Sequence, residues 1–192
     1  MGDANYHPDR WKEYVASLKK EGKEPAQEWA IFAARYRVAG NYCSASFFSL
    51  SEKTAKGYSE AIRLLLAYSA FEAACNASGR KPNECPVPSE EGFPKEARIL
   101  LQKAFNKTPE AEFPLRHALN SERLAGKIDA FLEGKEHNLQ PIASALRHLF
   151  AHGIWTPHGA DALSKTSCDA LDVLSQSLLW AADRLFESSN GI

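Results

Sequence analysis

Apolar residues recur every three or four positions along most of this chain, which is the spacing of one face of an α-helix. No segment shows the sustained alternation of apolar and polar residues that is typical of a strand. The pattern predicts helices in residues 11–20, 25–40, 49–79, 94–105, 121–134, 139–152 and 171–185. We therefore expect an all-α fold, an up-and-down helical bundle.

The helix of residues 49–79 is predicted to lie at the centre of the bundle. Ser49 and Glu52 have the S-x-x-E spacing of a capping box that opens a helix, and Gly79 can close it. Between them the stretch AIRLLLAYSAFEAA is apolar almost all round. This is typical of a helix that other elements cover on most sides.

The pattern also predicts a division of the chain and a contact between two copies. Residues 1–48 are expected to form an N-terminal helical extension, and residues 49–192 the bundle. The last helix carries an apolar seam of Leu171, Leu174 and Leu178. This seam and the central helix together carry more apolar surface than a small bundle needs to cover its core. We therefore expect a homodimer.

Composition and charge are those of an ordinary globular protein. Of the 192 residues 44% are hydrophobic and 24% are charged, and the net charge is -1, so any nucleic-acid contact must be local. No apolar run is long enough to cross a membrane, and the N-terminal MGDANYHPDRW does not resemble a signal peptide. The four cysteines are scattered without a C-x-x-C pair. We expect a cytoplasmic protein with reduced thiols and no membrane contact.

The common catalytic and cofactor-binding motifs are absent from the sequence. It contains no P-loop, no dinucleotide fingerprint, no nucleophile elbow and no H-E-x-x-H, and it lacks the E-x-x-H pairs of a di-iron bundle. We therefore expect no cofactor and no bound metal.

The candidate site lies at the end of a predicted helix that Asn138 can cap. Residues 145–157, ALRHLFAHGIWTP, place Arg147, His148 and His152 there, and a glycine follows. On an α-helix His148 and His152 are neighbours one turn apart. Arg147 lies on another side, but its long side chain could bring the guanidinium to the same phosphate-sized spot as His152.

Two other interpretations of this cluster are open. In the first, a histidine near the helix C-terminus interacts favourably with the helix dipole, and the arginine lies on the solvated face. In the second, His148, His152 and His158 bind a metal ion, although no acidic or cysteine ligand stands nearby in the sequence.

The string LRHLFAHG resembles the signature of the HEPN superfamily, which consists of small helical domains, many of them ribonucleases. That signature is an arginine, usually followed by a polar residue, and then a histidine a few residues later; Arg147, His148 and His152 match these positions. The longer string HLFAHGIWTP also looks like stand-alone bacterial members. The close resemblance covers residues 142–157, and the helical pattern of the bundle is compatible with it.

The resemblance implies a homodimer in which the two motifs face each other across a cleft. It also implies metal-independent cleavage of RNA, in which the 2′-hydroxyl attacks the adjacent phosphate. Arg147 and His152 would then be the catalytic residues, with His148 orienting them or binding RNA. These residue types suit the chemistry, since an imidazole titrates near neutral pH and a guanidinium stays charged.

We therefore expect a HEPN-like endoribonuclease that acts on RNA as a toxin or a defence-associated factor, with a cognate antitoxin protein as a partner. The alternative is a non-catalytic, dimeric HEPN-like module that binds RNA, a nucleotide or a protein, because several members of the family are thought to have lost catalysis.

Glu72 is a further candidate, because it lies on the apolar stripe of the central helix, where an unpaired carboxylate is costly to bury. One interpretation pairs Glu72 with Arg147 and so fixes the guanidinium at the cleft. In the other, Glu72 reaches solvent or meets a lysine, as acidic residues usually do.

Overall fold

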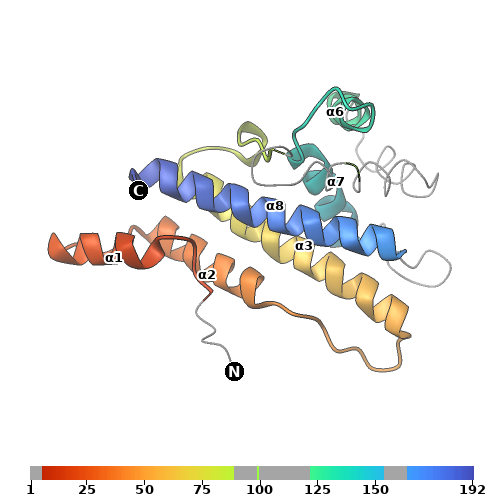
Figure 1. The fold of residues 1–192 in the computed structure, drawn as a ribbon, viewed down its shortest axis with the longest axis horizontal. Helices are drawn as coiled ribbons and strands as arrows, with labels where there is room; N and C mark the ends of the chain where they lie inside the picture. The colour runs from red at the N-terminus through yellow and green to blue at the C-terminus, as the bar shows by residue number, and fades with distance from the viewer. Residues whose placement is uncertain (1–5, 89–98, 100–121, 154–163) are drawn as a thin grey trace.

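The protein is an all-α helical bundle, as predicted (Figure 1). The computed structural model describes residues 6–88, 99, 122–153 and 164–192. Its helices are α1 (Trp11–Lys20), α2 (Gln27–Asn41), α3 (Glu52–Ala77), the short 3-10 helix η1 (Pro82–Glu84), α6 (Glu122–Leu132), α7 (Gln140–Ala151) and α8 (Lys165–Asn190). The helix predicted at residues 94–105 lies almost wholly outside the described residues.

Helices α3 and α8 lie side by side and form the long axis of the molecule (Figure 1). They run in the same direction: Lys56 Nζ lies 3.9 Å from Asp169 Oδ1, and two turns later Arg63 Nε lies 3.6 Å from Asp172 Oδ1. The chain must therefore travel back between the end of α3 and the start of α8. Helices α6 and α7 lie on this return path, and α7 packs against α3.

Helix α2 packs against α3 in the opposite direction. Arg35 donates a hydrogen bond to the carbonyl of Ser69 at 3.4 Å, while further along α2 the chain reaches Tyr42, whose ring centre lies 5.8 Å from the Arg63 guanidinium. Figure 1 shows α2 and α7 on different sides of the α3–α8 pair. The bundle thus has two separate flanks on which a site could be built.

The ends of α3 differ in part from the prediction. The helix begins two residues later than expected, because Ser51, and not Ser49, is its N-cap: the Ser51 hydroxyl accepts a hydrogen bond from the Thr54 N–H at 3.2 Å. Ser49 has a left-handed backbone with φ 65°, which does not suit the extended conformation of an N-cap. Gly79 does close the helix, as predicted, with φ 72° and a 2.9 Å hydrogen bond from Arg80 N–H to the carbonyl of Cys75.

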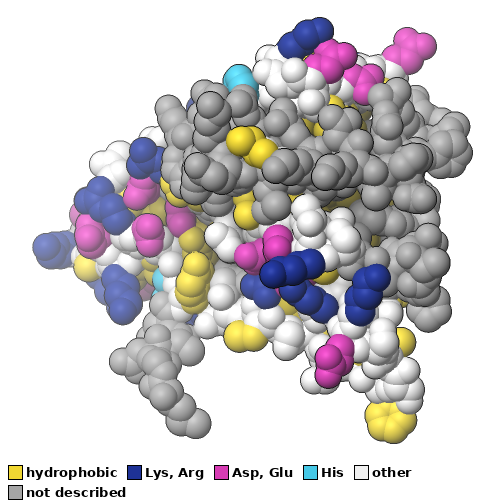
Figure 2. All heavy atoms as spheres, turned by 45° about the vertical axis from the view of Figure 1, so that its right-hand side comes forward, with side chains coloured by type: hydrophobic (Ala, Val, Ile, Leu, Met, Phe, Trp, Pro, Cys, Tyr) yellow, Lys and Arg dark blue, Asp and Glu magenta, His cyan; other side chains and the backbone are white. Residues whose placement is uncertain are grey.

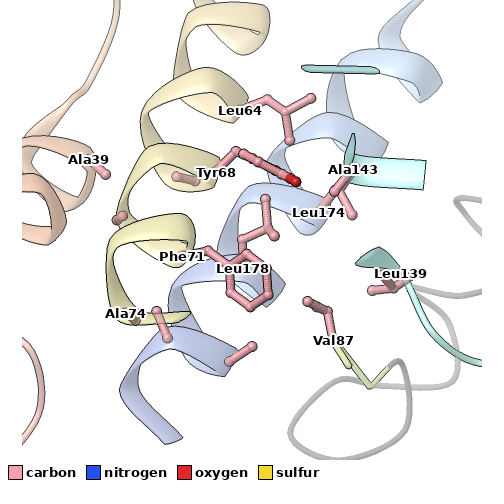
Figure 3. Packing of buried hydrophobic residues seen from close by; sticks show 14 of the residues in the cluster. Ala39, Leu64, Tyr68, Phe71, Ala74, Val87, Leu139, Ala143, Leu174 and Leu178 are labelled. Carbon is pink, nitrogen blue, oxygen red and sulfur yellow. The ribbon is translucent and has the colours of Figure 1, made fainter. Parts of the chain in front are cut away.

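The hydrophobic core lies between α3 and α8 and extends to α2 on one side and α7 on the other. Figure 3 shows Phe71 of α3 beside Leu178 of α8, with Val87 and Leu139 near them from the return path. All four of these side chains are at most 1% exposed. The prediction that α3 is the central helix is therefore confirmed.

The apolar seam of α8 is covered within a single chain. Leu171, Leu174 and Leu178 are at most 1% exposed and belong to the same core as α3 and α7. The argument that this seam is left over for a second copy was wrong, because it did not take account of the helices that pack on α8. The seam therefore provides no dimer interface.

The N-terminal helices share this core. The rings of Tyr14, Trp29 and Phe32 surround the buried Phe186 of α8, with ring centres 5.3 to 5.8 Å from its own. The hydroxyl of Tyr36 on α2 donates a hydrogen bond to Asp183 of α8. Residues 11–41 thus pack as part of the bundle.

Charged side chains of both signs lie close together on the face shown in Figure 2, as the net charge of -1 leads one to expect. None of the helices in the described part of the chain is both long and apolar enough to cross a membrane.

Candidate functional site

The start of α7 is fixed by one side chain. The Asn138 side-chain oxygen accepts a hydrogen bond from the N–H of Gln140 at 3.0 Å and another from the N–H of Val87 at 2.9 Å. The first bond satisfies a free N–H at the helix N-terminus, and the second ties the helix to the segment that follows η1. Asn138 therefore caps the helix with its side chain, as predicted, although the residue at the N-cap position itself is Leu139.

One face of α7 is buried, and the three motif residues lie outside it. Ile142, Leu146 and Leu149 are fully buried. Arg147 and His148 are half-buried and His152 is exposed. These three apolar residues follow helical spacing, so they share the face of α7 that packs into the core.

The motif coincides with the end of the helix. The N–H of His152 donates to the carbonyl of His148 at 3.1 Å, and Gly153 follows with φ 65°. A positive φ is readily available only to glycine, so Gly153 ends the helix directly after the motif. His152 consequently lies at the C-terminal end of the helix dipole, which favours a positive charge.

His148 and His152 are in direct contact. Their ring centres lie 4.3 Å apart, and the ring planes are inclined by 51°. This is the contact expected for residues one turn apart on a helix. The two imidazoles form one continuous surface at the end of α7.

Arg147 points in a different direction, toward α3. Its guanidinium carbon lies 5.7 Å from the ring centre of Tyr68, within the range of a cation–π interaction. Tyr68 is only 5% exposed, and Figure 3 shows its side chain reaching from α3 toward Ala143 of α7. In the described part of the chain no hydrogen bond or ring contact joins Arg147 to either histidine.

Glu72 lies on α3, one turn after Tyr68, and is half-buried. Among the ion pairs of the described residues none joins Glu72 to Arg147, whose guanidinium lies over Tyr68 instead. The charge of Glu72 contributes, after burial and the neighbouring Cys85, to raising the pKa of the Cys75 thiol. Of the two interpretations, the ion pair between Glu72 and Arg147 is therefore not formed in this structure.

The metal interpretation rests on a residue that the structure does not describe. His158 lies outside the described residues. Within the described ranges, no group of three histidine, cysteine or carboxylate side chains is arranged to hold a metal ion.

A basic hollow that sequence analysis did not identify lies near the motif. Arg123 and Lys127 of α6 and Ser144 of α7 line a hollow of about 170 Å³. Ser144 precedes Arg147 and His148 by one turn of the same helix. The four-residue spacing of Arg123 and Lys127 would have revealed that both lie on one flank of α6.

Sequence analysis also missed Asp183, which is 6% exposed. The signal was present, because Asp183 follows the buried Ala181 and Ala182 and precedes the buried Phe186. A carboxylate within such an apolar run needs a partner inside the protein. Its main partner, Tyr36, is too distant in the sequence to be recognised.

Comparison with protein-family models, with curated proteins and with solved structures finds no match to this chain.

Proposed function

We propose that the protein is a HEPN-like, metal-independent endoribonuclease. The observation that supports this best is the position of the motif: Arg147, His148 and the C-cap residue His152 lie at the C-terminal end of α7, outside its buried apolar face. Side chains at an exposed helix end are accessible to a ligand, and His152 is exposed there.

In the proposed reaction the 2′-oxygen of a ribose forms a bond to the adjacent phosphorus, and the bond from phosphorus to the 5′-oxygen breaks. The products are a 2′,3′-cyclic phosphate and a free 5′-hydroxyl. His152 takes the proton of the 2′-hydroxyl, and a proton is returned to the leaving 5′-oxygen. An exposed imidazole is suited to this transfer, because its ordinary pKa is close to neutral.

Arg147 stabilises the negative charge that develops on the phosphate, and His148 orients His152 or contacts the RNA. Within one chain Arg147 points toward Tyr68 and not toward His152. A second copy facing the first would place an arginine and a histidine from different chains around one phosphate. We therefore propose a homodimer with a composite cleft.

The substrate is RNA in single strands or loops, where the 2′-hydroxyl can reach the in-line position. Arg123 and Lys127 of α6 line a hollow together with Ser144, one turn before the motif, and would hold the phosphates next to the scissile one. These two local positive charges would attract RNA although the net charge of the whole chain is -1. We place the protein in the cytoplasm as a toxin or defence factor, regulated by a cognate antitoxin protein.

A second candidate is a non-catalytic, dimeric module that binds RNA, a nucleotide or a protein. The lack of contact between Arg147 and His152 within one chain favours it. In this case the histidine pair would serve as a stacking surface, and proton transfer would not occur.

Incubation of the purified chain with single-stranded RNA in EDTA tests the proposal. We expect cleavage to 2′,3′-cyclic phosphate ends in EDTA and its loss in His152→Ala. The binding module would retain RNA without cleaving it. Cleavage that EDTA abolishes and added metal restores would contradict the proposal and support the three-histidine metal site.

A further inference from the structure

A pocket of about 580 Å³ lies between the N-terminal segment, α2, α3 and α8. We name it the α2–α8 pocket. Its volume is within the range of about 300 to 1,000 Å³ that small-molecule sites occupy. No residue of the α7 motif lines it, so it is separate from the proposed ribonuclease site. The side chains that matter most are Tyr6, Asp9, Tyr36, Arg63, Trp180 and Asp183.

Asp183 is a buried carboxylate without a positive partner. One of its oxygens accepts a hydrogen bond from the N–H of Asp9 at 3.1 Å, and the other accepts one from the Tyr36 hydroxyl. Both donors are neutral, and no ion pair of the described residues includes Asp183. Burial first, and then the negative charges of Asp9 and Glu187, raise its pKa to about 7. A cation that entered the pocket would supply the missing countercharge.

The positive group in the wall of the pocket is already neutralised. Arg63 Nε donates to Glu60 at 3.0 Å, and Nη2 donates to the carbonyl of Cys43 at 2.8 Å. Asp172 lies 3.6 Å from the same guanidinium, so two carboxylates share one positive charge. The amide of Gln176 is also engaged, since it donates to Asp172 at 2.8 Å.

His7 adds an acceptor to the wall. Its Nδ1 is buried and has no hydrogen-bond partner among the described residues. Burial first, and then the positive charges of Arg37 and Lys12, lower its pKa. A neutral imidazole offers one acceptor nitrogen. This ring and the carboxylates therefore make the wall rich in acceptors, which suits a ligand that donates hydrogen bonds.

Aromatic rings complete the wall. Tyr6 stacks on Tyr36 with ring centres 5.8 Å apart. Trp180 is half-buried, and its ring already attracts one cation, the Arg184 guanidinium, at 5.7 Å. Aromatic faces attract cations, and they also cover the apolar part of an organic ligand.

We propose that the α2–α8 pocket binds a small organic cation, with an ammonium or guanidinium group donating hydrogen bonds to Asp183 and Asp9 and its carbon chain lying against Tyr6 and Trp180. An inorganic cation would satisfy the carboxylates but would leave the aromatic wall unused. An anion is excluded by the surplus of carboxylates around the pocket.

Isothermal titration calorimetry with agmatine and with 1,4-diaminobutane tests this proposal, and butane-1,4-diol serves as the neutral control of the same length. We expect both cations to bind with one site per chain and the diol not to bind. Loss of a charge-assisted hydrogen bond typically weakens binding about tenfold or more, so Asp183→Asn and Asp9→Asn should each raise the dissociation constant by that factor. Asp169→Asn, which removes a carboxylate of α8 outside the pocket, should leave it unchanged.

Circular dichroism of each variant shows whether the bundle is intact. Asp9 is exposed, so Asp9→Asn is expected to fold even if Asp183→Asn does not. The proposal is overturned if neither cation binds at millimolar concentration, if the diol binds equally well, or if the Asp9 and Asp169 variants have the same affinity. All these readouts are independent of RNA cleavage, so they do not depend on the proposed function.

Discussion

The guanidinium of Arg147 lies over the ring of Tyr68, 5.7 Å from its centre, and this contact couples the motif on α7 to the central helix. Tyr68 is buried and held by α3, so it provides a fixed platform for a long and otherwise mobile side chain. The arginine is therefore oriented by the core of the bundle, while the two histidines are oriented by their own helix.

The roles of the motif residues can be separated by substitution. His152→Ala should reduce RNA cleavage by about 10²- to 10⁴-fold, the usual effect of losing a proton-transfer group, and leave RNA binding nearly unchanged. Arg147→Ala should weaken both, because the guanidinium contacts phosphate before and during the reaction. Arg147→Lys should also fail, since an ammonium lacks the planar fork.

These effects are measured by single-turnover cleavage and by fluorescence anisotropy with labelled RNA. His137→Ala is the matched control, because it removes a histidine from the segment before α7 and should retain full activity. Unchanged cleavage by His152→Ala would refute the catalytic assignment.

Substitution of Tyr68 should affect RNA binding through Arg147. Tyr68→Phe keeps the ring face and should retain RNA affinity. Tyr68→Leu keeps an apolar side chain but removes the cation–π interaction, which is worth about 0.5 to 2 kcal/mol. We expect weaker RNA binding by Tyr68→Leu, measured by the same anisotropy assay, and no further loss when Arg147→Ala is added. Equal affinity of the two Tyr68 variants would show that the contact has no role in binding.

Asp183 should make the stability of the protein fall as the pH rises. Its pKa is about 7 in the folded protein and 3.8 ordinarily. Between these values the unfolded chain has already lost the proton that the folded protein still holds, so ionisation favours the unfolded state. Below the lower value this group has no effect, and above pH 7 the loss is complete. The negative charges of Asp9 and Glu187 disfavour ionisation of Asp183 and raise its pKa, whereas the hydrogen bond from Tyr36 lowers it.

Urea unfolding across this range provides the measurement. Wild type should lose more stability than Asp183→Asn as the pH rises from about 4 to about 7, because the amide cannot ionise. Asp169→Asn should follow the wild-type curve. Parallel curves for wild type and Asp183→Asn would show that Asp183 titrates normally.

Gly40 is required by the ring of Tyr6. A Cβ at position 40 would clash with a ring carbon of Tyr6, so Gly40→Ala must displace this ring. In a helix, alanine is more favourable than glycine by up to about 1 kcal/mol. Gly40→Ala should therefore raise the free energy of unfolding in a Tyr6→Ala background. In the wild type the displaced Tyr6 ring should cancel this gain. A double-mutant cycle by urea unfolding measures the difference. Additive effects would mean that Tyr6 does not pack on α2.

Features that depend on neighbouring residues could be predicted from the sequence. The capping of α7 by the Asn138 side chain and its termination before Gly153 are local events, and the burial of Leu146 follows from helical spacing. The N-cap of α3 was misplaced because two serines two residues apart both offer a cap, and only the backbone conformation of Ser49 rules it out.

Features that depend on packing could not be predicted. The direction of Arg147 is set by Tyr68, which lies on another helix, and spacing within α7 contains no information about it. The same holds for the hydrogen bond between Tyr36 and Asp183, which are 147 positions apart. Helical periodicity also shows which face of α8 is apolar, but not whether a helix of the same chain or of another copy covers it.

The parallel arrangement of α3 and α8 has a consequence for how the protein is made. The core closes only when α8 packs on α3, and α8 follows every other described helix in the chain. During synthesis α2, α3 and α7 therefore leave the ribosome while the face of α3 that α8 covers is still open. A nascent chain that ended before α8 would leave exposed the apolar side chains of α3, such as Phe71, that lie against α8 in the folded protein. Exposed apolar surface of this kind promotes aggregation, so we expect the chain to be most prone to aggregation just before α8 is added.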